Sequence, residues 1–142
     1  MNEIGVEVVR MANLAVEAFQ ERAGGRLDFS EGSLEVVEEM LAESAQWREH
    51  LDDEHVNGMV QRFGCYILET ARAEFGGEYS WHEEGDQPVL VVGEPEFHVA
   101  IIAWGKVEGR INGDEADNIP FFYSGFAARA REGAPGTRAV YV

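Results

Sequence analysis

The segment FGCYILETARAEFGG, residues 63–77, holds the residue types that come nearest to a chemical site. Cys65 is the only cysteine, and helical spacing places Glu69 one turn and Arg72 two turns beyond it along one line. A reactive thiolate needs a nearby cation or helix N-terminus to lower its pKa, whereas Glu69 would raise it. We therefore interpret Gly64 and Cys65 as small residues that let another element cross closely, with Glu69 and Arg72 paired.

Two short clusters contain residue types that bind divalent metals: REHLDDEH at 48–55 and HEEGD at 82–86. Neither has a spacing that corresponds to a coordination geometry, and HExxH is absent. An acid-rich helix start and a polar hairpin turn explain both clusters without a metal. Phosphate-binding loops and a Gly-x-Ser-x-Gly elbow are also absent. We predict no metal, no cofactor and no catalytic residue.

The net charge is the strongest signal. Eleven Lys and Arg against 27 Asp and Glu give a formal charge of −16, which argues against binding nucleic acid or an anionic membrane. Residues 31–54 alone hold nine acids and one base, Arg48. Like charges one helical turn apart repel, so a cationic partner would relieve this face. The candidate partner-binding residues are Glu35, Glu38, Glu39, Glu43, Glu49, Asp52 and Asp53.

The resulting hypothesis is an acidic binding protein that captures a basic protein partner, such as an inhibitor or immunity protein for a toxin with a basic active site. A single cysteine cannot form a disulfide within the chain, so nothing in the sequence requires an oxidising compartment. No stretch has the roughly 20 apolar residues of a membrane span. The start of the chain lacks the charge pattern of a signal peptide, so we expect a cytoplasmic protein. Composition does not predict an oligomeric state.

A ligand-binding protein or small enzyme is the alternative from a different class. Its pocket would lie between the helices and the sheet. The residues that we expect around it are Tyr66, Glu69, Arg72, Trp81 and His98.

Apolar spacing and turn residues predict the elements that must position these side chains. Residues 96–111 are ambiguous, because HVAIIAW could be a buried strand while Val99, Ala103, Val107 and Ile111 recur at helical spacing; we favour a helix. The other predicted helices are 3–23, a second helix with Ser30 or Ser33 as its N-cap that runs to about Leu51, about 53–75 and 118–133. The predicted strands are 78–83, 88–92 and 137–142. This order predicts one α+β domain over 1–142, with about five helices packed on a small antiparallel sheet of about three strands.

Two motifs are similar to those of a group of small uncharacterised bacterial proteins. In that group an aspartate, an aromatic residue and a serine precede a helix that begins Ser-Leu, and a Gly-x-Tyr-x-x-Glu helix leads to Gly-Gly and a tryptophan strand. The matching positions here are Asp28, Phe29, Ser30, Ser33, Leu34, Gly64, Tyr66, Glu69, Gly76, Gly77 and Trp81. The resemblance spans roughly residues 10–130, and it implies no activity that transfers to this chain.

Overall fold

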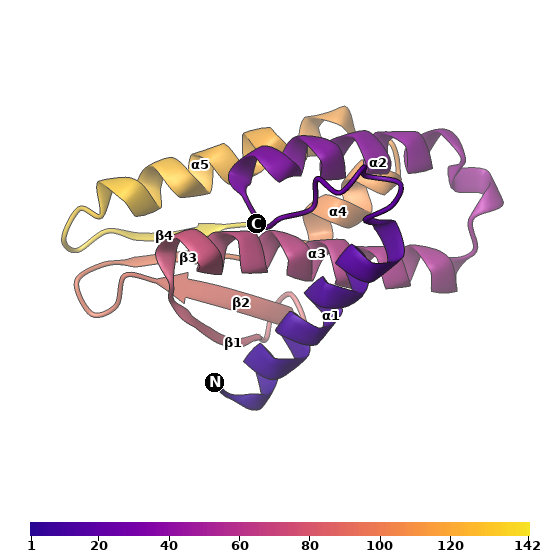
Figure 1. The fold of residues 1–142 in the computed structure, drawn as a ribbon. Coiled ribbons are helices and arrows are strands. Elements are labelled where there is room, and N and C mark those ends of the chain that lie inside the picture. The colour runs from indigo at the N-terminus through magenta and orange to yellow at the C-terminus, as the bar shows by residue number, and fades with distance from the viewer.

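A computed structural model describes all 142 residues, and it confirms the α+β class (Figure 1). Five α-helices pack with a four-stranded sheet. The helices are α1 (Glu3–Phe19), α2 (Leu34–Gln46), α3 (Asp53–Phe75), α4 (Trp104–Ile111) and α5 (Ile119–Glu132). The strands are β1 (Glu78–His82), β2 (Gln87–Val92), β3 (His98–Ile101) and β4 (Arg138–Tyr141). Short 3₁₀ turns at Glu31–Ser33, Arg48–His50 and Glu115–Asp117 precede or link helices.

The sheet is mixed, which corrects the antiparallel sheet of about three strands predicted from sequence. Its order is β1-β2-β3-β4, with β1, β2 and β3 antiparallel and β4 parallel to β3. The predicted hairpin and C-terminal strand are both confirmed. That last strand, β4, pairs with β3, where Val99 lies opposite Ala139, and not with the hairpin.

The helix favoured for residues 96–111 is wrong over its first part. His98–Ile101 forms β3, and only Trp104–Ile111 is helical. β3 lies between β2 and β4, so nearly all of its side chains are buried and it reads as a continuous apolar run without alternation. Such a run cannot be told from a buried helix by periodicity alone.

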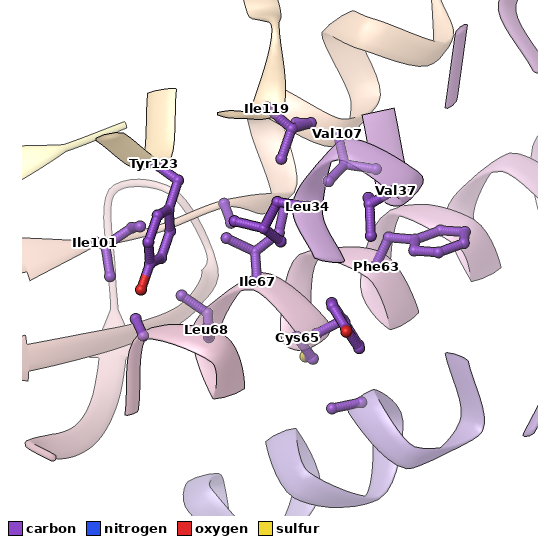
Figure 2. Close-up of a cluster of buried hydrophobic side chains, with 14 of the residues drawn as sticks. Leu34, Val37, Phe63, Cys65, Ile67, Leu68, Ile101, Val107, Ile119 and Tyr123 are labelled. Atoms are coloured by element: carbon purple, nitrogen blue, oxygen red, sulfur yellow. The ribbon is translucent and has the colours of Figure 1, made fainter. Parts of the chain in front are cut away.

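The long helix α3 lies at the centre of the molecule, where α1 crosses it and α2 and α5 lie above it in the view of Figure 1. Val37 of α2, Phe63, Ile67 and Leu68 of α3, and Tyr123 of α5 meet in one core, as Figure 2 shows. This core also takes one face of the sheet, through residues such as Leu90, Val99 and Ile101. The alternate residues Val89, Ala100 and Ile102 form a separate cluster.

Candidate functional site

Glu38 faces the protein interior, unlike Glu35, Glu39 and Glu43, the other glutamates of α2. Its Oε2 accepts a hydrogen bond from Arg110 Nε at 2.6 Å, and its Oε1 accepts one from the backbone N–H of Ile119 at 3.0 Å. The two side chains are only 14% and 10% exposed. Glu38 therefore ties α2 to α4 and to the first turn of α5, and it is not free to contact a partner.

Glu35, Glu39 and Glu43 form an exposed line along α2, one helical turn apart. Two of them have arginine neighbours from the segment after α1: Arg22 lies 2.6 Å from Glu43, and Arg26 lies 3.9 Å from Glu39. All four side chains of these pairs are close to half exposed or more, so each pair contributes about 0 to 1 kcal/mol. Glu35 has no basic partner. Counting bases within residues 31–54 gave only Arg48, because Arg22 and Arg26 lie outside that segment of the chain.

The remaining three predicted partner-binding residues lie around the start of α3. Asp52 is the N-cap of that helix and accepts a hydrogen bond from His55 N at 2.7 Å. Asp53 is 95% exposed and 3.7 Å from Arg48, and Glu49 is 84% exposed and 3.6 Å from His50. Glu49 and Asp53 therefore remain open to a partner, whereas Asp52 already has a structural contact.

The five residues of the alternative pocket are not brought together. The hydroxyl of Tyr66 is buried, accepting from Phe29 N at 2.9 Å and sharing a hydrogen bond with Ser33 at 2.7 Å. His98 pairs with Glu94, at the far end of the sheet from Trp81. Tyr66, Trp81 and His98 lie in separate places, and of the five residues only Glu69 and Arg72 are hydrogen-bonded to each other.

Glu69 and Arg72 form the ion pair predicted from their spacing. Arg72 donates to both Glu69 oxygens, from Nε at 2.6 Å and from Nη2 at 2.9 Å. Tyr79 of β1 adds a hydrogen bond from its hydroxyl to Glu69 Oε2 at 2.7 Å. Burial is the main cause that raises the pKa of Tyr79, and the Glu69 carboxylate raises it further, so the hydroxyl stays protonated and donates. This network ties the end of α3 to β1.

Trp81, the remaining member of that set, lines a cavity of about 290 Å³ between α1, α3 and the β1–β2 hairpin. Trp104, from the start of α4, forms a second aromatic wall of the cavity. Its apolar lining is completed by Ile4, Val8, Met11, Cys65 and Pro88, and its polar lining is Glu3, Glu7 and Gln61. Sequence reasoning missed Trp104, which lies in the segment whose first part was assigned to the wrong element.

The indole of Trp104 lies directly against the backbone of Gly64. A Cβ added at Gly64 would overlap Trp104 Cδ1 and lie 3.0 Å from Nε1. The backbone N–H of Trp104 donates to Gln87 Oε1 at 3.0 Å, which fixes the start of α4 beside β2. The prediction that Gly64 is small because another element approaches closely is therefore confirmed, and the approaching group is a side chain.

Cys65 lies in the wall of the cavity but is only 1% exposed. Figure 2 shows it projecting from α3 on the side opposite Ile67. Burial raises the pKa of the Cys65 thiol to about 12, and the neighbouring Trp104 indole offsets this only in part. The thiol is thus protonated at neutral pH, which does not favour a nucleophilic role.

Because burial raises the pKa of Cys65, the free energy of unfolding should fall at alkaline pH, and this fall can be measured. In the unfolded chain the thiol ionises from about pH 9, whereas in the folded protein it stays protonated to about pH 12. The contribution of the protonated thiol to the free energy of unfolding is therefore fully present below pH 9 and is lost as the pH rises toward 12. At about pH 9.5 the loss is about 0.8 kcal/mol. Between about pH 7.5 and about pH 9.5, urea unfolding should show about 0.8 kcal/mol more loss in the native protein than in Cys65→Ala, since the ionisation of tyrosines is common to both. An equal loss in both proteins would contradict the assignment.

No group of three or more histidine, cysteine, aspartate or glutamate side chains is placed to hold a metal ion. None of the five helices combines the length and apolar character needed to cross a lipid bilayer.

The fold and the site together define an acidic α+β protein with a mixed four-stranded sheet and one aromatic-walled cavity. The sequence matches no family model, and comparison with curated proteins and with solved structures gave no match. A functional assignment therefore depends on the geometry described above.

Proposed function

We propose that the protein is a cytoplasmic binding protein that captures a basic protein partner through exposed carboxylates, as an inhibitor or immunity protein would. One observation carries the proposal: the basic side chains are almost all used within the molecule. Nine of the eleven form ion pairs, and only Arg62 and Arg129 do not. Sixteen of the 27 carboxylates have no Lys, Arg or His partner.

This imbalance supports long-range attraction of a cationic surface. An excess of unpaired charge of one sign steers an oppositely charged partner and raises its association rate at low salt. The proposed contact set keeps the exposed members of the acidic group: Glu35, Glu39, Glu43, Glu49 and Asp53. The exposed pairs with Arg22 and Arg26 are weak enough to be exchanged for contacts with a partner. Glu38 leaves the set, because its interactions are internal.

Charge reversal on α2 tests the proposal. The variant Glu35→Lys/Glu39→Lys/Glu43→Lys should keep the fold, since all three side chains are exposed, and lose the partner. A matched control, Glu17→Lys/Glu84→Lys/Glu108→Lys, changes the net charge equally at exposed positions on other elements and should retain it. The partner is first captured from native cell extract at low salt, and the purified partner is then titrated against both variants at low and high salt.

At low salt we expect the α2 variant to bind the partner at least tenfold more weakly than the native protein does. We also expect the affinity of the native protein to fall as salt is added. An equal loss in both variants would show that net charge matters and the α2 line does not. Binding that resists salt and both sets of reversals would overturn the electrostatic proposal.

A further inference from the structure

The cavity beside α1 has two tryptophan walls that meet at a right angle. The ring centroids of Trp81 and Trp104 lie 6.4 Å apart, and their planes are inclined by 89°. The two planes are perpendicular and the contact is edge-to-face, so they form a corner in which a small group can contact both indoles. Trp81 is 40% exposed and Trp104 is more deeply placed, against Gly64. The corner thus has one wall at the surface and one wall inside.

The charged groups of the cavity are all of one sign. Glu3 and Glu7, one turn apart on α1, are the only residues with charged side chains in the lining, which contains no Lys, Arg or His. Glu3 has no ion-pair partner, whereas Glu7 pairs with Arg10, whose Nη2 also lies 4.0 Å from Met11 Sδ, so Glu3 carries the unpaired charge of the cavity. An anion entering this cavity would meet carboxylates and the π systems of two indoles, with no unpaired cation in the lining. A cation would be attracted by both.

The rest of the lining is suited to an alkyl group and not to a strongly hydrated one. Ile4, Val8 and Met11 of α1 and Pro88 of β2 provide apolar surface. A bare ammonium or a metal ion would lose most of its hydration there, since beyond the two carboxylates only the Gln61 amide adds an oxygen ligand, and the indole N–H of Trp104, which has no hydrogen-bond partner, is a donor. The volume, about 290 Å³, lies at the lower end of the range of ligand pockets and suits a small ligand.

We propose that this cavity binds a small organic cation of the alkylated ammonium class, with its alkyl groups against the Trp81–Trp104 corner and its charge near Glu3 and Glu7. This site goes beyond the capture of a basic protein, because it uses none of the carboxylates on α2. The two proposals can therefore fail separately.

Choline and its neutral carbon isostere, in which a tert-butyl group replaces the trimethylammonium group, are the probes that separate charge from shape. Titration calorimetry should give choline about tenfold higher affinity than the isostere. Indole fluorescence in a Trp47→Phe background, in which Trp81 and Trp104 are the remaining tryptophans, should change with the same midpoint. Failure of choline to bind, or equal affinity for the isostere, would overturn the proposal.

Two substitutions locate the site. Trp81→Leu keeps an apolar wall but removes one ring, so it should abolish most of the preference for choline. Glu3→Gln should weaken choline binding about threefold and leave the isostere unchanged, whereas Glu17→Gln, on the same helix but outside the cavity, should change neither. Thermal unfolding confirms that each variant is folded. If Trp81→Leu and Glu3→Gln bind choline as the native protein does, the site is not this cavity.

Discussion

Replacing Glu38 by alanine should lower the free energy of unfolding by about 3–5 kcal/mol, the range for removal of one partner of a buried ion pair. The variant leaves the guanidinium of Arg110, whose side chain is 10% exposed, without its carboxylate, and the backbone N–H of Ile119 without its acceptor. A domain of this size has a total stability of about 5–15 kcal/mol, so the loss is a large fraction of it. Urea-induced unfolding followed by circular dichroism measures the change.

Glu39→Ala is the matched control, because it removes the same side chain from the next position of α2. Glu39 is 68% exposed and its only basic neighbour, Arg26, is 3.9 Å away, so we expect a change within about 0.5 kcal/mol. Glu38→Gln should lie between the two, since it keeps an acceptor and loses the charge. Equal effects at positions 38 and 39 would contradict the internal role of Glu38. They would also return it to the candidate partner surface.

Replacing Glu69 by alanine should cost about 3 kcal/mol of unfolding free energy, the second large effect. The variant removes both hydrogen bonds from Arg72 and leaves the buried hydroxyl of Tyr79 without an acceptor. Arg72 is 35% exposed and can be partly hydrated, which keeps the loss below that expected at position 38. The same urea titration measures it.

The double variant Glu69→Ala/Tyr79→Phe shows whether the unsatisfied hydroxyl causes part of this loss. Removing the hydroxyl together with its acceptor should make the double variant less destabilised than the sum of the two single variants. Glu69→Gln, which retains an oxygen for Tyr79, should recover about half of the loss. Strict additivity in the double-mutant cycle would show that the two groups do not interact.

Local patterns were sufficient for most helices of this protein. The N-cap at Asn118, Pro120 in the first turn and the left-handed Gly133 bound α5 as predicted, because capping and backbone conformation act within a few residues. The i,i+3 pairing of Glu69 with Arg72 was predictable for the same reason. The strand β3 was not, since its burial depends on β4, which lies nearly forty residues further along the chain.

The sequence by itself determined the net charge, the helices with an amphipathic period, the hairpin and the presence of a single cysteine, whereas the burial of that cysteine came from the structure. Only the tertiary structure decided which acids are neutralised and where an aromatic cavity forms. Arg110 reaches Glu38 across 72 positions, and Trp104 reaches Gly64 across forty. Contacts of this kind follow from how helices and strands pack, because Coulomb attraction and steric fit act over a few ångströms in space, whatever the distance along the chain.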